Sequence, residues 1–238
     1  MSYLRYVKVI GTMHVSPESR EEVLRTILAE RPDAIAIELD RARFMAMMEN
    51  GKRGLSLGES FRYGRRGLVN YLLAKLEEKL GEEFGMVPGG EMVAAVEASR
   101  TLGVPLYLID EDINLILGKI LSAPFREKLF MALEGLAVLL PIKVGRGDAG
   151  GLMEDYRFMM LQFRERYPYL YRVLVEERNE IMARNLISIV DSLLAAGIKR
   201  PRVVAVVGLG HQNGIEHILD RQSRSLIWRL TPRVSFEN

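Results

Sequence analysis

The chain has no cysteine among its 238 residues. This absence excludes disulfides, zinc sites with thiolate ligands, iron–sulfur clusters and cysteine nucleophiles. Histidine is scarce as well, with three copies in the whole chain, so the position of each one is informative. An excess of either charge is also missing, because 33 Lys and Arg against 31 Asp and Glu give a net charge of +2. That balance does not favour nucleic acid or an anionic membrane as a partner.

Long apolar runs are absent too. The most apolar stretch, 131–144, is interrupted by Glu134 and Lys143, and a membrane helix needs about 20 predominantly apolar residues. Arg5 and Lys8 lie inside the first apolar run, which is not the pattern of a signal peptide. We therefore predict no membrane span and a cytoplasmic location. The excess of Arg over Lys, 25 to 8, is compatible with a thermophilic source.

Short apolar runs alternate with helical patterns along the chain. The predicted strands are 6–10, 34–39, 105–109, 202–207 and 225–230. Alternation of this kind predicts an α/β fold with a mostly parallel sheet flanked by helices. The whole chain, 1–238, is expected to be a single domain with a helical insertion around 113–195. A Gly-rich turn, 208–214, is expected to separate the fourth strand from a short helix.

Four of the predicted strands end in residues that can carry chemistry. These ends are Gly11-Thr12-Met13-His14, Glu38-Leu39-Asp40, Asp110-Glu111-Asp112 and Gly208-Leu209-Gly210-His211. Ligands of open α/β sheets bind where parallel strands end at their carboxyl edge. We therefore expect two imidazoles and several carboxylates to meet at one edge.

Two of the three histidines share a local frame: an apolar strand, a glycine, two residues and then the histidine. Gly11 opens the frame of His14, and Gly208 opens that of His211. A glycine directly after a strand allows a tight turn and leaves room for a ligand or a facing chain. The repetition favours a ligand-binding role, with ordinary strand-end histidines as the alternative. His217 has no such frame and is expected to be a surface or packing residue.

Glu38 and Glu91 are the carboxylates with the most informative surroundings. Glu38 follows a buried strand, where an isolated charge is costly, so it needs Arg43, another basic group or a metal ion as a partner. The alternative is a structural ion pair with Arg41 or Arg43. Glu91 opens a predicted helix, where the helix dipole favours a carboxylate by ~0.3–1 kcal/mol. A plain first-turn acid is therefore the alternative for Glu91.

Other motifs point to no further chemistry. The glycines from Gly208 to Gly214 do not match the dinucleotide-binding fingerprint, and neither a phosphate-binding P-loop nor a Gly-x-Ser-x-Gly nucleophile elbow is present. Arg178 and Asn179 lie in a mostly apolar helix. Taken alone, that pair is typical of the solvated face of a helix.

Six segments, in chain order, resemble the motifs of the TraB/PrgY family. They are Gly11-Thr12-Met13-His14-Val15-Ser16, Glu38-Leu39-Asp40 with Arg43, Gly89-Gly90-Glu91-Met92, Ile109-Asp110, Glu177-Arg178-Asn179 and Val207-Gly208-Leu209-Gly210-His211. The family includes bacterial pheromone-shutdown proteins. It is similar to the animal TIKI metalloproteases and, more distantly, to the erythromycin-esterase and ChaN-like proteins. The resemblance covers essentially the full chain.

The resemblance implies two pseudo-repeated halves, each of which brings one Gly-x-x-His strand end to a shared cleft. The implied metal ligands are His14, His211, Glu38 and Glu91. The residues implied in catalysis are Glu38, Glu91, Arg43 and Arg178. The other residues implied to line the cleft are Gly11, Asp110, Asn179 and Gly208. One carboxylate would complete the metal shell, the other would act as general base, and an arginine would orient a carboxylate or stabilise an oxyanion.

The leading expectation is a metal-dependent hydrolase, a peptidase or an enzyme for small amides or esters. Mn²⁺ or Co²⁺ is the favoured ion and Zn²⁺ a further option, because imidazole and carboxylate ligands without thiolate suit these metals. One alternative is a non-catalytic regulator that sequesters a signalling peptide. Another is a scaffold whose cleft holds only structural ion pairs. An exposed apolar helix face in the middle region would favour a homodimer.

Overall fold

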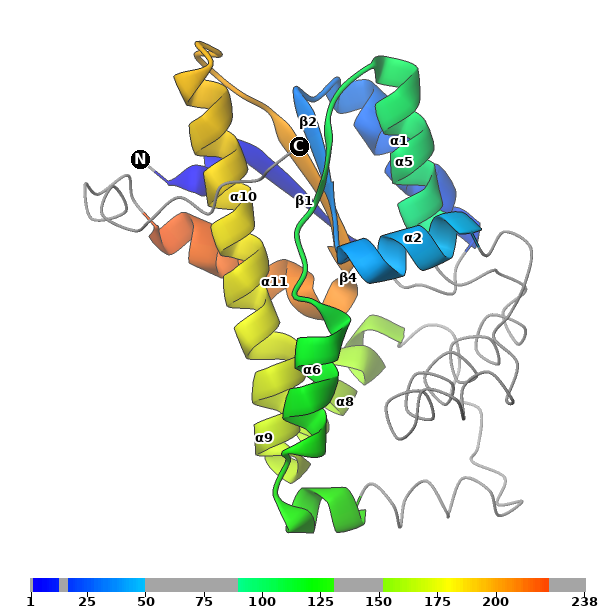
Figure 1. Cartoon of the computed structure of the whole chain (residues 1–238), viewed down its shortest axis with the longest axis vertical. Coiled ribbons are helices and arrows are strands. Elements are labelled where there is room, and N and C mark those ends of the chain that lie inside the picture. The colour runs from blue at the N-terminus through cyan, green and yellow to red at the C-terminus, as the bar shows by residue number, and fades with distance from the viewer. Residues whose placement is uncertain (1, 13–16, 50–89, 131–151, 223–238) are drawn as a thin grey trace.

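The computed structural model describes residues 2–12, 17–49, 90–130 and 152–222 (Figure 1). Four parallel strands form its sheet, namely β1 (Val7–Thr12), β2 (Ala34–Ile37), β3 (Leu106–Leu108) and β4 (Val203–Gly208). The predicted α/β fold with a parallel sheet flanked by helices is therefore confirmed. The fifth predicted strand, 225–230, lies outside the described residues.

The strand order is β1-β4-β2-β3, so β4, the last of these strands in the chain, lies in the middle. Its six residues are all buried, as expected of a continuous apolar run in a parallel sheet. Gly11 of β1 pairs with Val207, and Ile37 of β2 pairs with Val206. This order brings the ends of β1, β4 and β2 side by side at one edge of the sheet.

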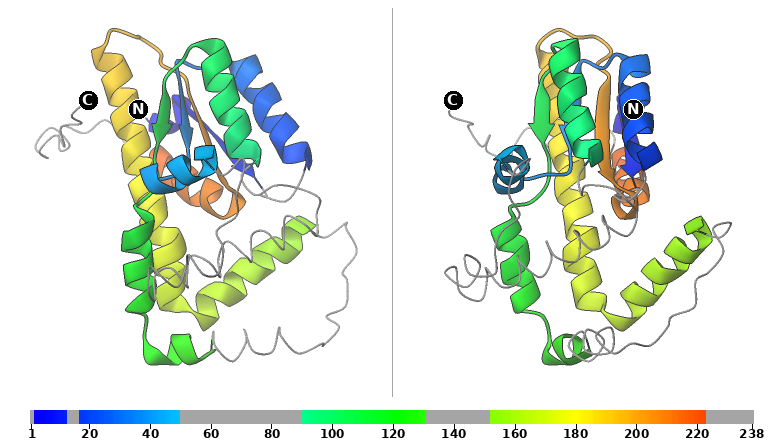
Figure 2. Two further views of the ribbon diagram at one scale, coloured as in Figure 1. Left: turned by 45° about the vertical axis from the view of Figure 1, so that its right-hand side comes forward. Right: turned by 90° about the vertical axis from the view of Figure 1, so that its right-hand side faces the viewer.

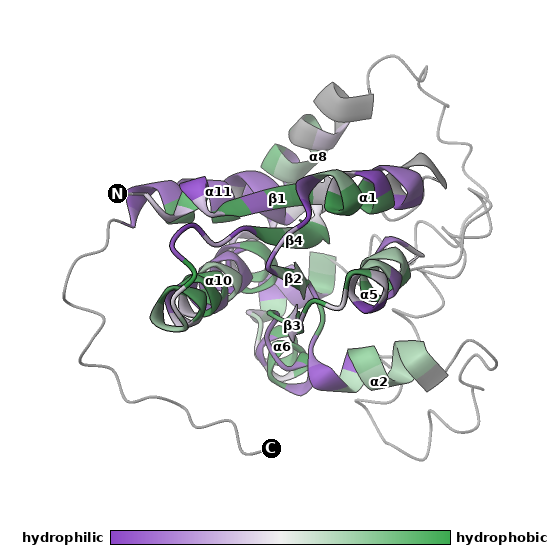
Figure 3. Ribbon diagram, turned by 90° about the horizontal axis from the view of Figure 1, so that it is seen from above, coloured by the Kyte–Doolittle hydropathy of each residue, from purple (hydrophilic) through white to green (hydrophobic). Residues whose placement is uncertain are grey.

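Each face of the sheet buries its own apolar cluster, because successive side chains of a strand point to opposite faces. Helices α10 (Glu177–Ala195) and α11 (Leu209–Arg221) cover one face, with Val203 and Ala205 beneath them. Helices α1 (Pro17–Glu30) and α5 (Gly90–Leu102) cover the other. Figure 3 shows these pairs on opposite sides of the four strands.

The predicted helical middle of the chain forms an arm beyond the carboxyl edge of the sheet (Figure 2). Its elements are α6 (Ile113–Leu121), α8 (Leu152–Arg166), α9 (Pro168–Tyr171) and the π-helix η3 (Arg172–Glu176), which runs directly into α10. Residues 125–130 are helical as well, and the short helices η1 (Tyr3–Arg5) and α2 (Arg41–Glu49) lie outside this arm. None of the helices that the structure describes is long and apolar enough to cross a bilayer.

The expected turn over 208–214 is wrong, since α11 begins at Leu209 directly after β4. The glycines of α11 allow neighbouring side chains to pack closely against its backbone. A Cβ atom at Gly210 would lie 2.6 Å from Tyr156 Oη, and one at Gly214 would lie 2.1 Å from Asn179 Nδ2. Both distances are too short for a side chain, so glycine lets Tyr156 and Asn179 approach the backbone of α11.

Candidate functional site

The carboxyl edge of the sheet gathers charged and polar side chains from strand ends and from α2, α10 and α11. We call this group the carboxyl-edge site, and it comprises Glu38, Asp40, Arg43, Asp110, Arg178, Asn179 and His211. The convergence of strand ends expected from the sequence is therefore present for β2, β3 and β4. His14 lies outside the described residues, so its approach to His211 stays a prediction.

Arg178 is the centre of this site. Its Nη2 donates to Glu38 Oε1 and, at 2.6 Å, to Asp110 Oδ2, while its Nε donates to Asp110 Oδ1 at 3.0 Å. Nη1 donates to the Leu174 carbonyl, in the π-helix, at 3.2 Å. Burial alone would lower the pKa of Arg178, but its bonds to Asp110 and the two negative charges outweigh burial and raise it. Arg178 is thus a permanent cation that joins two strand ends.

Arg43 holds the other side of Asp110. Its guanidinium pairs with Asp110 and, at 2.5 Å, with Asp40. Asp40 also accepts from the backbone N–H of Ala42 at 2.7 Å, so it caps α2. The sequence interpretation that made Arg41 or Arg43 the structural partner of Glu38 is therefore wrong. Arg43 is taken up by the two aspartates, and Arg178 is the cation on Glu38.

Asp110 lies between the two arginines, with its side chain fully buried. Burial by itself would raise the pKa of this carboxyl. The hydrogen bonds and positive charges of Arg178 and Arg43 outweigh burial and lower the pKa from 3.8 to about 2. Asp110 is therefore ionised at any physiological pH and keeps both guanidinium groups in place.

Glu38 has a partner for each carboxylate oxygen. Oε2 accepts from the backbone N–H of Gly208 at 2.6 Å, and Oε1 accepts from Arg178. The same Oε1 lies 3.3 Å from His211 Nε2. Because the carboxylate is only 8% exposed, these contacts offset the cost of burying its charge. Gly208, the last residue of β4, thus contributes a backbone donor.

His211 is buried in the first turn of α11, and its Nδ1 lies 2.7 Å from Asn179 Oδ1. A carbonyl oxygen can only accept, so Nδ1 donates this bond and Nε2 faces Glu38. Asn179 is itself buried and packs against Gly214. The pair Arg178 and Asn179 therefore faces the sheet, and the solvated-face interpretation of that pair is wrong.

Glu91 lies in the first turn of α5 on the other face of the sheet. Thr12, which ends β1, donates from its hydroxyl toward Glu91 Oε1 at 3.5 Å and toward the Val207 carbonyl at 3.3 Å. Glu91 is fully buried, which is unlike a plain, solvated first-turn acid. Gly11 lies beside Gln212, since a Cβ atom there would come within 2.3 Å of Gln212 Oε1.

Tyr156 is a site residue that the sequence patterns do not predict. It projects from α8, and its hydroxyl lies against Gly210. Burial, followed by the negative charge of Glu38, raises its pKa, so the phenol keeps its proton. Within the described residues this hydroxyl has no hydrogen-bond partner. The one feature of the sequence that indicates the approach of Tyr156 to α11 is a glycine inside that helix, Gly210.

His211 and Glu38 supply two donors for a metal ion. They lie 3.3 Å apart, and two ligands about 2.1 Å from one ion would be separated by roughly 3.0–3.4 Å. The bond from Nδ1 to Asn179 is also typical of a metal-binding histidine. No group of three His, Asp or Glu that could hold a metal occurs in the described parts of the chain. The third donor of the implied set, His14, lies outside them.

The TraB/PrgY/gumN family model matches residues 145–224. An uncharacterized protein of Methanocaldococcus jannaschii is 32% identical over 219 residues, which cover 90% of this chain and 53% of that protein. The TraB domain-containing proteins of Homo sapiens and Mus musculus are each 32% identical over 88% of this chain and 61% of their own length. The chain thus spans between half and two thirds of the relatives it matches. As its motifs predict, the chain is similar to the TraB/PrgY/gumN family, whose model matches residues 145–224, and to TraB domain-containing proteins over 88% of its length.

Proposed function

We propose that this chain is a metal-dependent hydrolase that acts on a peptide or another small amide or ester. The observation that carries the proposal is the buried pair of His211 and Glu38. Their facing atoms are 3.3 Å apart, and Asn179 directs His211 Nε2 toward the carboxylate. Buried, oriented imidazole and carboxylate at the carboxyl edge of a parallel sheet are suited to bind a metal and a polar substrate.

His211 and Glu38 would hold the ion together with His14, and Glu91 is the remaining carboxylate for general base. When bound, Mn²⁺, Co²⁺ or Zn²⁺ would supply Lewis-acid activation of water and of the scissile carbonyl. Glu38 Oε1 would then carry both the ion and the Arg178 guanidinium. Asp110 offsets this local positive charge, because it pairs with the same guanidinium.

Arg178 and Tyr156 take different parts in this proposal. Both donor edges of Arg178 are occupied by Glu38 and Asp110, so the guanidinium positions those carboxylates and is not free to bind an oxyanion. Tyr156 is protonated and has no hydrogen-bond partner within the described residues. Its hydroxyl can therefore donate to the oxygen on which negative charge develops.

The test combines metal analysis with peptide cleavage. Purified protein is analysed for its metal content and then incubated with a peptide library after Mn²⁺, Co²⁺ or Zn²⁺ has been added separately. We expect cleavage with at least one ion, and we expect His211→Gln to abolish both cleavage and metal binding. His217→Gln is the matched control, because His217 is an exposed residue of the same helix. Equal loss in both variants, or no cleavage with any ion, contradicts the proposal.

A non-catalytic peptide-binding regulator is the second candidate. It is favoured by the engagement of Glu38 and Arg178, whose charged atoms already have protein partners. Groups that are engaged in this way are not available to activate water, so a peptide bound at this edge would not be cut. Such a regulator would bind a library peptide that mass spectrometry recovers intact, and a metal chelator would leave the binding unchanged.

The assembly and location of the protein stay predictions. A homodimer requires an exposed apolar surface in the helical middle, and Leu115, Phe125 and Phe158 are 59%, 77% and 63% exposed there. Sedimentation of the purified full chain tests the dimer. The cytoplasmic location is tested by fractionating cells that express the chain.

A further inference from the structure

The amino edge of the sheet, opposite the carboxyl-edge site, carries a group of basic side chains. The segments that precede β1, β4 and β2 are neighbours at this edge because those strands are neighbours in the sheet. They carry Arg5, Lys199, Arg200, Arg202 and Arg31. Three segments that are far apart in the sequence thus place five cations at one edge. This feature is independent of the function proposed above.

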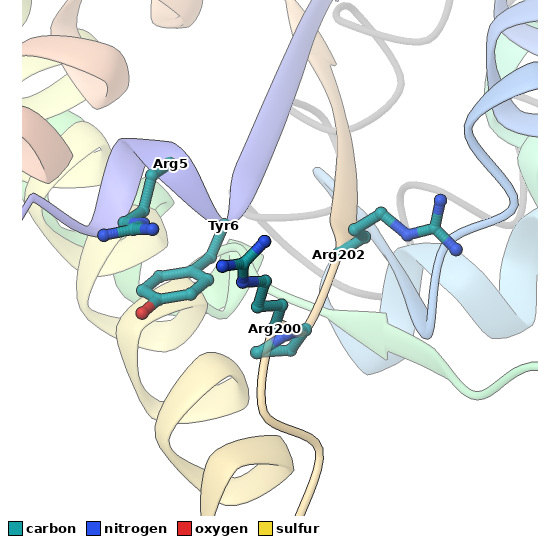
Figure 4. Close-up of a pocket in the computed structure, with 5 residues that line it drawn as sticks. Arg5, Tyr6, Arg200 and Arg202 are labelled. Carbon is teal, nitrogen blue, oxygen red and sulfur yellow. The ribbon is translucent and has the colours of Figure 1, made fainter.

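A cavity of about 460 Å³ lies at this edge, lined by Arg5, Tyr6, Arg200, Pro201 and Arg202 (Figure 4). We call it the amino-edge cavity. Arg5 lies over the Tyr6 ring, 5.3 Å from its centroid, and Arg200 approaches the same ring, whereas Arg202 extends away from it. Small-molecule sites have volumes of ~300–1,000 Å³, so the cavity is large enough for a small ligand.

The positive charge of Arg200 and Arg202 is not neutralised by the residues that the structure describes, because neither side chain forms an ion pair there. Asp33, in the adjoining loop, accepts from the backbone N–H of Arg202 at 2.7 Å. Lys8 and Glu30 form a satisfied pair at 2.7 Å. An anion in the cavity would relieve the repulsion between like charges.

The backbone that carries these arginines is held in place. The N–H of Val203 donates to the Tyr6 carbonyl at 2.8 Å, and the N–H of Asp33 donates to the Arg202 carbonyl at 2.8 Å. Pro201 is buried and has a restricted backbone dihedral. The guanidinium groups therefore extend from a rigid base, which lowers the entropic cost of binding a ligand.

We propose that the amino-edge cavity binds the phosphate group of a small molecule, with Arg200 as its principal ligand. The planar fork of a guanidinium matches two oxygens of a phosphate, and this bidentate geometry favours phosphate over halide ions. Three arginines, Arg5, Arg200 and Arg202, line this one cavity in a chain of net charge +2. A small phosphorylated molecule therefore fits better than the extended backbone of a nucleic acid, which needs a basic stripe.

The test is calorimetric titration of the full chain with inorganic phosphate and with phenyl phosphate, a minimal phosphate monoester. Sodium chloride at matched ionic strength is titrated in parallel. We expect saturable binding of both phosphates and none of chloride. We also expect Arg200→Gln to raise the Kd for phosphate by about tenfold or more, because a charge-assisted bidentate contact is lost. Arg200 is exposed, so the variant should keep the wild-type melting temperature.

Arg25→Gln is the matched control, since Arg25 is an exposed cation on α1 that pairs with Glu21 and does not line the cavity. It removes the same charge and should leave the Kd within about twofold, as expected for a distant surface charge. Equal weakening in Arg200→Gln and Arg25→Gln, or no saturable binding of either phosphate, overturns the proposal. So does binding to phosphatidic acid vesicles without binding of the free phosphates, which would identify a membrane surface.

Discussion

His211 and Asn179 are joined by a hydrogen bond of 2.7 Å between the ring Nδ1 and the side-chain Oδ1, although they lie on different helices. Asn179 therefore sets which ring nitrogen faces Glu38. Replacing Asn179 with Ala should leave a buried N–H unpaired and cost about 1–3 kcal/mol of stability. It should also weaken Mn²⁺ binding by ~10–100-fold, as loss of such a partner usually does.

Urea unfolding and calorimetric titration with Mn²⁺ measure the two effects of Asn179→Ala. Asn185→Ala is the control on the same helix, because Asn185 donates one hydrogen bond to the Ile109 carbonyl at 2.8 Å. That variant should lose stability and keep its metal affinity. A similar loss of affinity in both would mean that Asn179 has only a structural role.

Substitution by alanine should have opposite effects on stability at Gly214 and at Gly118. A Cβ atom at Gly214 would lie 2.1 Å from Asn179 Nδ2 and 2.9 Å from its Cγ, so Gly214→Ala should destabilise the protein by about 1–3 kcal/mol through overpacking. Gly118 lies within α6 and meets no atom within 4 Å. Gly118→Ala should stabilise it by ~0.4–1 kcal/mol. Melting temperatures of both variants test the pair, and the same sign in both would contradict the prediction.

Asp110 predicts a loss of stability in acid. Its pKa is about 2 in the folded chain against 3.8 ordinarily, so the unfolded chain takes up the proton first as the pH falls. The ion pairs of Asp110 therefore contribute about 2 kcal/mol above pH 4, and this contribution is lost as the pH falls from about 4 to 2. Urea unfolding between pH 5 and pH 2 measures it. In Asp110→Asn the same pH range should have a smaller effect, and an unchanged pH dependence would refute the assignment.

Arg178→Lys should destabilise the protein even though it keeps the positive charge. Lysine has no planar fork, so it cannot reproduce the bonds of Arg178 to Glu38 and to both oxygens of Asp110. Loss of a bond between charged groups costs about 1.5–3 kcal/mol. Arg172→Lys is the control, because Arg172 is a half-exposed residue 3.5 Å from Glu177. Chemical denaturation should separate the two variants, and equal unfolding free energies would argue against the central role of Arg178.

Tyr156→Phe separates catalysis from stability. The Tyr156 hydroxyl has no hydrogen bond among the described residues, so its removal should leave the melting temperature almost unchanged. If it stabilises an oxyanion, kcat should fall by ~10²–10³-fold. Tyr169→Phe is the control, since its hydroxyl donates to the Lys119 carbonyl at 3.3 Å, away from the site. The assay uses whichever peptide the library screen identifies, and wild-type turnover in Tyr156→Phe would exclude this role.

The sequence by itself determined the class of fold and the strand ends that meet at the carboxyl edge. The apolar runs that become β2 and β4 are short and continuous, which is the pattern of strands buried in a parallel sheet. Glu38 follows β2 directly and Asp110 lies two residues after β3, so a correct prediction of the strands also placed both carboxylates. These features are local, because strand propensity and burial depend on a few consecutive residues.

The tertiary structure alone decided which charges pair and which face of each helix carries the site. Glu38 pairs with Arg178, 140 residues away, and not with nearby Arg43, because α10 packs on one face of the sheet with its first turn beside the end of β2. The same packing brings Tyr156 against Gly210. From the sequence this glycine predicts a turn, whereas in the structure it allows a close contact between two helices. Such contacts depend on the order of the strands and on how the helices pack on them. Both follow from the burial of the two faces of the sheet at once, and no local sequence pattern encodes that.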